Sequence, residues 1–372
     1  MATIGYMIVA SLGYLGIVIA IRYFRIRPLQ RHPLINFLVG FGFTSIILKL
    51  TLTVAFLLVG IVSLGLLTAY DILPDWFDIF QITIVVLIGV FPFLGSIYGI
   101  IFGKYRFTAE HVTLSFPDLP PAFDGLKMIQ ISDVHSGTWD SIKGVKKGID
   151  LIAKQDADVL VFTGDLVNAD KDEIDPFIDL FASLKFPMGK FAVLGNHDYY
   201  GQPREREHRE AYYLDFFNKY ERMGFDLINN EHRTLSKNGD QLQIVGVENW
   251  GSGRYFPKRG DLDQACAGIN NSDFKILLSH DPSHWELKAL DHPMHFHLTL
   301  SGHTHGMQFG INLPFFKWSP VQYRYKQWMG LYTKKAQHLY VNRGFGLLAF
   351  PGRVGMSPEV TVITFKRKSA TT

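Results

Sequence analysis

The sequence predicts a layered domain of the α/β or α+β class, preceded by an all-helical region that crosses a membrane. Up to residue 103 the chain is apolar and poor in charge, and from Lys104 onward charges, turns and short apolar runs alternate. Beyond residue 110, runs rich in β-forming residues recur between helical stretches, which is typical of packed sheets and helices. We therefore expect a helical region at 1–105 and a layered domain at 106–372, and the 372 residues allow each to bury a core.

Composition excludes several classes of protein. The formal net charge is +3, and no run of five or six basic residues occurs, so we expect no nucleic-acid-binding face. Cys266 is the single cysteine, which excludes an intramolecular disulfide framework and a cysteine-rich zinc module. The simplest interpretation of this cysteine is a small apolar core residue.

The helical region contains three candidate spans. Residues 3–21 are uncharged and long enough to cross about 30 Å of hydrocarbon, and the start lacks the positive region of a signal peptide. Residues 35–69 form either one tilted, protruding helix or two tightly joined spans. We favour one helix because no Pro, Asn or Asp interrupts residues 37–70. Residues 79–102 contain Pro92, which predicts a kink tolerated within a membrane bundle.

The distribution of charge predicts the orientation of these spans. Residues 22–31 carry four arginines, and the charged residues of 70–78 are all aspartates. Lys104 and Arg106 follow the last span. Three spans with the N-terminus outside put both basic segments, and with them the large domain, on the cytoplasmic side. Four spans would put that domain outside, so the topology depends on residues 35–69.

The layered domain is predicted from eight β-rich runs and four helical runs. The β-rich runs are 126–132, 158–164, 190–196, 242–247, 274–280, 296–302, 338–342 and 359–365. The helical runs are 141–155, 174–184, 205–223 and 283–290.

Polar residues follow five of the β-rich runs, at the point where each strand would end. In layered α/β folds ligand sites form at such ends, because rigid backbone positions the loop residues there. One histidine at such a place is more often a packed or capping residue, but five strand ends that each deliver Asp, Asn or His are hard to explain as packing. The residues are Asp133 and His135, then Asp165, then Asn196, His197 and Asp198, then His280, and finally His303 and His305.

Seven of these side chains form a suitable ligand set for metal ions. Imidazole, carboxylate and amide oxygen suit Zn, Mn or Fe, and the set contains no cysteine thiolate. Seven ligands are more than one ion needs, whereas two ions that share a bridging carboxylate use them all. Two ions roughly 3.5–4 Å apart can each hold a phosphoryl oxygen and ionise a bridging water, which points to phosphate-ester hydrolysis. The seven are Asp133, His135, Asp165, Asn196, His280, His303 and His305.

Five motifs, in order along the chain, resemble the calcineurin-like metallophosphoesterase superfamily. They are "ISDVHSG", "FTGDLVN", "LGNHDYY", "LLSHDP" and "LSGHTHGMQ". The resemblance runs from about residue 126 to residue 365 and does not cover residues 1–105. The last motif and the closing "RGFG…PGRVGMSPEV" are similar to bacterial membrane-associated members, which implies a multi-pass protein of a bacterial inner or cell membrane. The implied fold is a four-layer α/β/β/α sandwich with two facing mixed sheets.

The resemblance also implies a role for each residue around two divalent ions. Asp133 and His135 would bind the first ion, and His305 would complete that site. Asp165 would bridge both ions. The nucleophile would be a metal-bridging hydroxide that attacks in line.

The second ion would be held by Asn196, His280 and His303. His197 would be no ligand but would donate a proton to the leaving oxygen, and Asp198 would orient it. A carboxylate beside an imidazole favours the charged acid form, which suits that role.

One position departs from the pattern of the superfamily. Many members have "GDxxD" in the second motif, whereas this chain has Asn168 in place of the last aspartate. The position is not a ligand in the pattern, so the metal site should survive. Any orientation that this side chain gives to a neighbouring histidine would weaken from an ionic to a neutral hydrogen bond.

The membrane region favours a phosphodiester or pyrophosphate carried on a lipid as the substrate. Residues 313–330 interleave aromatic and basic side chains, which suits a membrane interface or a phosphate headgroup, although the aromatics would equally pack on their own core. Arg353 is a candidate phosphate contact. A soluble nucleotide or generic phosphodiester is the alternative substrate, and a metal-binding scaffold without catalysis is the non-enzymatic alternative.

Overall fold

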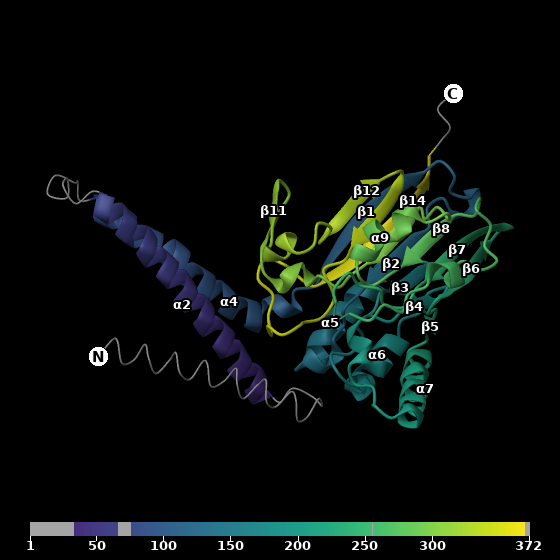
Figure 1. Ribbon diagram of the computed structural model, residues 1–372, viewed down its shortest axis with the longest axis horizontal. Helices are drawn as coiled ribbons and strands as arrows, with labels where there is room; N and C mark the ends of the chain where they lie inside the picture. Colours follow the sequence, from purple (N-terminus) through teal and green to yellow (C-terminus); the bar gives the residue numbers. More distant parts are fainter. Residues whose placement is uncertain (1–32, 66–75, 255, 369–372) are drawn as a thin grey trace. The chain divides into compact units, whose positions relative to one another are not determined.

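The computed structural model describes residues 33–65, 76–254 and 256–368 (Figure 1). The chain divides into two compact units, one that extends to Lys104 and one that begins at Tyr105. The segment Ala349–Val354 belongs to the first unit, although the sequence predicted an undivided second domain. The predicted span 3–21 and the basic segment 22–31 lie outside the described residues.

In the helical unit, α2 is one continuous helix, Pro33–Gly65. The sequence left residues 35–69 open between one helix and two joined spans, and the structure has a single helix over the described part of that range. Its portion Gly42–Leu64 is long and apolar enough to cross a membrane. Large side chains such as Phe56 are more than half exposed, as expected of a helix that faces an apolar surrounding.

The second apolar segment consists of α3 (Trp76–Val85), a π-helical turn η2 (Val86–Val90) and α4 (Phe91–Ile101). Together, Trp76–Ile101 is long and apolar enough to cross a membrane. The π-helical turn ends at Val90, two residues before Pro92, where the sequence predicted a kink. Proline lacks an N–H group and crowds the preceding helical turn, and a π-helical turn is one way in which a helix accommodates it.

The segment Ala349–Val354 joins the helical unit through close backbone packing on α4. The backbone N–H of Arg353 donates to the carbonyl of Gly99 over 3.1 Å. A Cβ atom at Gly103 would lie 2.2 Å from the carbonyl oxygen of Arg353. The two glycines therefore permit an approach that a larger residue would block.

The second unit contains two six-stranded mixed sheets and a separate two-stranded hairpin. One sheet has the order β1-β14-β2-β3-β4-β5, and the other has the order β12-β13-β9-β8-β7-β6. The strands of the first sheet are β1 (Thr108–Phe116), β14 (Glu359–Arg367), β2 (Lys127–Ile131), β3 (Val159–Phe162), β4 (Lys190–Ala192) and β5 (Asp226–Leu227). The strands of the second sheet are β12 (Gly330–Lys334), β13 (Gln337–Val341), β9 (Leu298–Ser301), β8 (Lys275–Leu278), β7 (Asp240–Gly246) and β6 (Glu231–Lys237).

The alternation of side chains along the strands creates three apolar layers between four layers of structure. In the first sheet, Ile129 and Leu160 join the cluster that packs on α5, α6 and α7, whereas Met128 and Val159 point to the other face. That inner face packs on residues of the second sheet such as Ile276. The helices that cover the outer face of the first sheet are α5 (Ile142–Ala153), α6 (Ile178–Ala182) and α7 (Arg206–Arg222).

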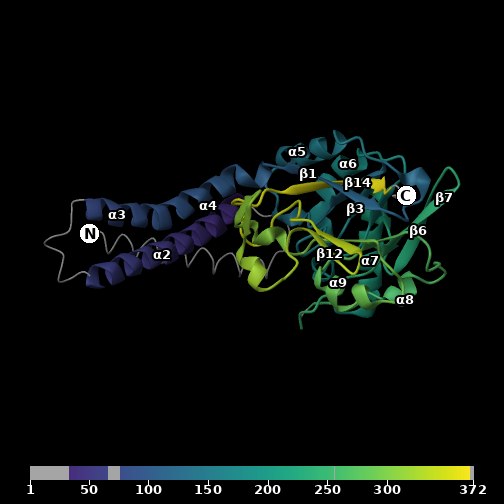
Figure 2. The same ribbon diagram turned by 90° about the horizontal axis from the view of Figure 1, so that it is seen from above.

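The outer face of the second sheet carries the remaining helices. Val245 and Leu277 pack there against Trp285 and Leu262. The helices are α8 (Leu262–Ala265) and α9 (Ser283–Leu287). The four-layer α/β/β/α sandwich is therefore confirmed, and the ribbon in Figure 2 shows α5 and α6 on one side and α8 and α9 on the other.

All eight predicted β-rich runs contain a strand, with ends that differ by a few residues. Several strands at the edges of the sheets were not predicted, among them β1, β6 and β12, because their exposed faces break the apolar pattern. The strands β2, β3, β4, β8 and β9 occupy the middle of the two sheets. Each of them is parallel to at least one neighbour, so their carboxyl ends lie together and carry the predicted site residues.

Candidate metal centre

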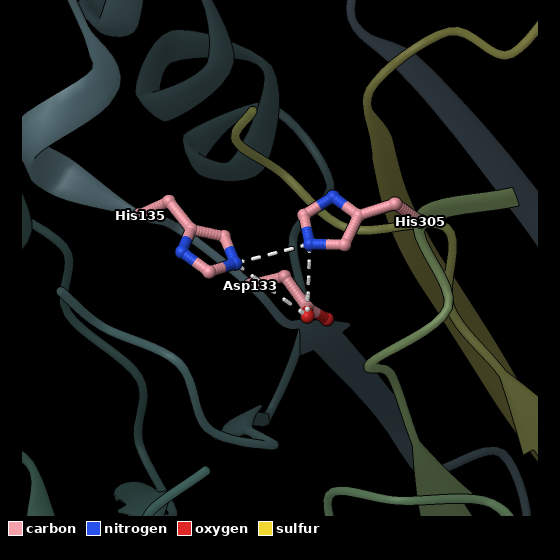
Figure 3. A group of neighbouring side chains, drawn as sticks. All are labelled: Asp133, His135 and His305. Atoms are coloured by element: carbon pink, nitrogen blue, oxygen red, sulfur yellow. Dashed lines mark hydrogen bonds and ion pairs between the residues drawn. The ribbon is translucent and has the colours of Figure 1, made fainter. Parts of the chain in front are cut away.

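A first group of side chains joins the end of β2 to the end of β9. Asp133, His135 and His305 each offer a ligand atom, and these atoms lie within 4.8 Å of one another. Nε2 of His305 is 3.2 Å from Oδ1 of Asp133 and 3.0 Å from Nε2 of His135. Figure 3 shows the two ring nitrogens and the carboxylate turned toward one point. This arrangement could hold a metal ion.

A second group surrounds Asp165 at the end of β3. Asp165, His280 and His303 also present ligand atoms within 4.8 Å of one another. One oxygen of Asp165, Oδ2, lies 3.2 Å from Nε2 of His280 and 3.6 Å from Nε2 of His135. The same oxygen therefore faces a histidine of each group, which is the position that a bridging ligand would take. The other oxygen accepts a hydrogen bond from the backbone N–H of His197 over 2.8 Å.

His280 is oriented by a backbone contact outside the cluster. Its Nδ1 lies 2.7 Å from the carbonyl of Thr163, and because a carbonyl can only accept, Nδ1 carries the proton. Nε2 is then left to face Asp165. An imidazole held in this way by its outer nitrogen is the usual arrangement of a histidine that binds a metal.

Asn196 places an amide oxygen in the same region without a protein partner. Its side chain is 1 % exposed, and its Oδ1 has no hydrogen-bond partner among the described residues. Its Nδ2 donates to the hydroxyl of Tyr200 over 3.1 Å, which fixes the orientation of the amide. A buried, unpaired amide oxygen is costly unless a ligand pairs with it, so Asn196 fits a metal-binding role.

Most of the predicted ligands have left-handed backbone. This conformation is uncommon for residues other than glycine and persists only where the surrounding structure enforces it. Here it turns the chain sharply in the loops that follow the strands. The φ angles are 53° at Asp133, 44° at His135, 61° at Asp165, 71° at His303 and 53° at His305.

The electrostatics of the cluster favour cation binding. Burial alone would raise the pKa of the carboxyls of Asp133 and Asp165, but their histidine neighbours hold both pKa values below the usual range. Burial lowers the pKa of His135 and His303, so both rings are neutral at neutral pH. The two carboxylates are fully buried and paired only with histidines among the described residues, so their negative charge is compensated best by a metal ion.

His280 is the exception among these imidazoles. Burial opposes its charge, but the attraction of Asp165, a hydrogen bond to it and the charge of Asp133 outweigh burial and raise the pKa of His280 to about 10. Without a metal, this ring therefore carries the proton that compensates Asp165. A metal ligand must be deprotonated, so a bound ion would displace that proton.

His197 lies at the edge of the cluster and is partly exposed. Its Nδ1 is 2.7 Å from the backbone carbonyl of Asn168, so Nδ1 donates and Nε2 is directed elsewhere. The ring packs edge-on against His135, with centroids 4.7 Å apart. Its ligand atom also lies within 4.8 Å of those of His135 and Asp165, which makes a third group that could hold a metal.

The expectation that Asp198 orients His197 is wrong. The carboxylate of Asp198 accepts four backbone hydrogen bonds of 2.8–3.2 Å, and the backbone carbonyl of Asn168 orients His197 instead. For the same reason, the side chain at position 168 does not weaken the orientation of His197, because the contact is made by the main chain. The four donors are the N–H groups of Asp165, Leu166, Val167 and Gly195.

Glu173 was not predicted, although it supports the loop that carries Asn168. Its buried carboxylate accepts hydrogen bonds from the backbone N–H groups of Asn168 (2.6 Å), Ala169 (3.2 Å) and Gly137 (3.2 Å). It also closes a capping box with Asp170. The spacing Asp-x-x-Glu is a readable signal of such a box, so the sequence offered a clue to this residue.

Tyr325 is a second residue that the prediction did not include. Its hydroxyl makes a hydrogen bond of 2.8 Å with Nε2 of His303. The two residues are 22 positions apart in the sequence, and the two-stranded hairpin lies between them, so only the folded chain reveals the contact.

Arg353 does not share a unit with the predicted ligands. It belongs to the unit that contains the helices, and its side chain is only 2 % exposed. The role of Arg353 as a phosphate contact stays a prediction.

A cavity of about 820 Å³ lies beside the loop of Asn196 and His197. Leu194 and Tyr199, which flank that loop, contribute to its wall. Residues of α7 and Arg259 complete it. The residues of α7 include Arg206, Arg209 and Tyr213.

A four-layer sandwich whose strand ends present buried Asp, Asn and His side chains defines a metal-dependent phosphoesterase. Residues 126–307 match the calcineurin-like phosphoesterase family. The chain belongs to this family, and it is a hydrolase of phosphoester bonds.

Relatives support this assignment along most of the chain. An uncharacterised metallophosphoesterase of Bacillus subtilis, YkuE, is 34 % identical over 265 residues, which are 70 % of this chain and 85 % of the relative. A "transmembrane protein with metallophosphoesterase domain" of Danio rerio is 25 % identical over 73 % of this chain, which matches 60 % of that protein's length. A "UDP-2,3-diacylglucosamine pyrophosphatase", LpxG of Chlamydia trachomatis, is 29 % identical over 62 % of this chain and 81 % of the relative.

The substitution Asp198→Asn tests the structural role of this carboxylate. An amide would turn one NH₂ group toward backbone N–H donors that now have an acceptor, so we expect a loss of about 2–4 kcal/mol in the free energy of unfolding. Because Asp165 is held by the same network, metal affinity should also fall. Chemical denaturation and elemental analysis measure the two effects. Unchanged stability and metal content, with slower turnover alone, would contradict the structural role and return Asp198 to the orientation of His197.

Proposed function

We propose that this protein hydrolyses a phosphodiester or pyrophosphate bond at a pair of divalent metal ions, and that its substrate is linked to a lipid. The observation that carries the proposal is the carboxylate of Asp165. One of its oxygens faces a histidine of each ligand group, His135 on one side and His280 on the other. This geometry supports two ions that share one ligand rather than a single ion.

In this proposal each ion has its own set of side chains. Asp133, His135 and His305 hold one ion, and Asp165 is shared. The other ion takes the imidazoles of His280 and His303 together with the unpaired amide oxygen of Asn196. The donors are nitrogen and oxygen only, which suits Zn, Mn or Fe.

The chain's own residues position and protonate the substrate. When bound, the two ions would neutralise charge on the phosphoryl oxygens and lower the pKa of a water molecule. His197 holds one proton at Nδ1 against the carbonyl of Asn168, so its Nε2 can carry a second proton and donate it to the leaving oxygen. Its partly exposed position at the edge of the cluster suits contact with a leaving group.

The lipid-linked substrate rests on two independent observations. Two helices of the chain are long and apolar enough to cross a membrane. The relative LpxG is named for a substrate that carries two acyl chains and a pyrophosphate bond. An anchored enzyme meets lipid-borne substrates in the plane of the membrane, where both are concentrated.

Elemental analysis and a substrate screen test the proposal on purified full-length protein in detergent. We expect two ions per chain and cleavage of an acylated sugar–nucleotide pyrophosphate, with both lost in the Asp165→Asn variant because the shared ligand is weakened. A second expectation is that cyclic nucleotides are cleaved poorly. Efficient cleavage of soluble nucleotides alone would support the alternative substrate, and a metal-loaded protein that cleaves no activated phosphodiester would be a scaffold.

The variant His197→Ala tests the proposed proton donor. We expect turnover of a substrate with a poor leaving group to fall by about 10²–10⁴-fold, because general acid catalysis supplies roughly that factor. A nitrophenolate ester, whose leaving group needs no proton, should be affected far less. Metal content serves as the control and should stay the same. Equal losses on both substrates together with a lost ion would show instead that His197 is a ligand.

We also propose that three membrane spans precede the catalytic domain in the sequence, and that this domain lies on the cytoplasmic side of a bacterial inner membrane. The charge distribution around the spans supports this orientation. A cysteine placed at the half-exposed Asp150, in a chain that also carries Cys266→Ala, should react with a membrane-impermeant maleimide only after the cells are opened. Labelling of intact cells would overturn the topology.

A further inference from the structure

A two-stranded hairpin within the second unit exposes an apolar tip. Its strands are β10 (Ile311–Leu313) and β11 (Phe316–Trp318), paired antiparallel and separate from both large sheets. Figure 1 shows β11 in a narrow projection from the body of the unit. The tip residue Phe315 is 86 % exposed, and Phe316, Leu313 and Ile311 are 43–49 % exposed. Adjacent large apolar side chains at one protruding tip are rarely left in water without a partner.

The neighbouring residues show that this exposure is not a failure of local packing. Val321, Trp328, Met329 and Met356 form a small buried cluster of their own directly after the hairpin. For residues 313–330 the sequence allowed either a membrane interface or aromatics packed on their own core. The two interpretations apply to different halves of the segment. The later half contributes Val321, Trp328 and Met329 to its own core, although Tyr323 is 80 % exposed, and the earlier half remains outside that core.

The charge of the segment is of one sign. Residues 308–330 contain Lys317, Arg324 and Lys326 but no aspartate or glutamate, and all three basic residues are exposed. Aromatic side chains next to basic ones suit the boundary between acyl chains and anionic headgroups. A tip built from strands of three residues also presents far less than the roughly 800 Å² per partner of a stable protein interface.

The base of the hairpin is fixed to the loop that carries two predicted ligands. The hydroxyl of Ser319 donates to the carbonyl of Gly306 over 2.9 Å. The hydroxyl of Thr304 donates to the carbonyl of Trp328 over 2.7 Å, and Tyr325 bonds His303 as described above. A surface that binds the hairpin is therefore linked through these hydrogen bonds to the loop that carries His303 and His305.

We propose that the tip of the β10–β11 hairpin inserts into the surface of an anionic lipid bilayer and docks the metal-binding loop at the headgroups. The apolar side chains enter the acyl boundary, and Lys317 pairs with lipid phosphate. This contact is additional to the apolar helices. It holds whichever phosphoester the enzyme cleaves, so it goes beyond the proposed function and can be tested without a substrate.

The test places an environment-sensitive fluorophore on the hairpin of the full chain. A nitrobenzoxadiazole label is attached at Phe315→Cys in a Cys266→Ala background, and the protein is reconstituted in vesicles of phosphatidylcholine and phosphatidylglycerol. The matched control is Leu214→Cys on α7, because Leu214 is also an exposed apolar residue, at 65 %. We expect a blue shift at position 315 and quenching by lipids that carry a nitroxide on the acyl chain, with neither effect at position 214.

Further outcomes decide against the proposal. A label at position 315 that is as polar and as weakly quenched as the label at 214 would overturn it. A blue shift without quenching by nitroxide lipid, or energy transfer between labelled copies, would show that protein covers the tip. The second variant, Lys317→Glu, should weaken quenching at position 315 in anionic vesicles but not in vesicles of phosphatidylcholine alone. Because no turnover is measured, failure here leaves the catalytic proposal standing.

Discussion

The rest of the second unit depends on one constraint: the two buried carboxylates of Asp133 and Asp165 must be compensated. They are almost inaccessible to solvent, and among the described residues their side-chain partners are imidazoles rather than lysine or arginine. Such charges are stable only where hydrogen bonds and cations surround them. The parallel strands in both sheets, the left-handed turns at their ends and the backbone network of Asp198 all serve to bring those partners to one place.

The core of the fold could be predicted from the sequence because the central strands are buried on both faces. Runs such as 158–164 and 274–280 contain uninterrupted apolar stretches, 159–162 and 276–278, so their strands are visible without any tertiary information. The edge strands β1 and β6 were not visible, because most of their side chains are exposed or only partly buried. The separation of Ala349–Val354 from its flanking residues could not be predicted either, since it depends on packing against a helix remote in sequence.

The site shows the same division between local and non-local information. The predicted ligands could be read because each follows an apolar run, and the structure gathers all of their Asp and His members into groups. The roles of Asp198 and Asn168 were misjudged because they depend on which backbone groups meet when two loops fold against each other. Tyr325 and Glu173 act through hydrogen bonds to partners that the sequence spacing does not identify. The capping box of Glu173 with Asp170 is the exception.

The position of β14 has a consequence for how the protein is made. This strand, Glu359–Arg367, lies in the first sheet between β1 and β2, parallel to one and antiparallel to the other. The sheet therefore cannot close until β14, which lies far beyond β2 in the sequence, has left the ribosome. The apolar helices are synthesised long before that, so they emerge while the hydrolase is still unfinished. Until β14 pairs with them, β1 and β2 keep open edges that invite aggregation.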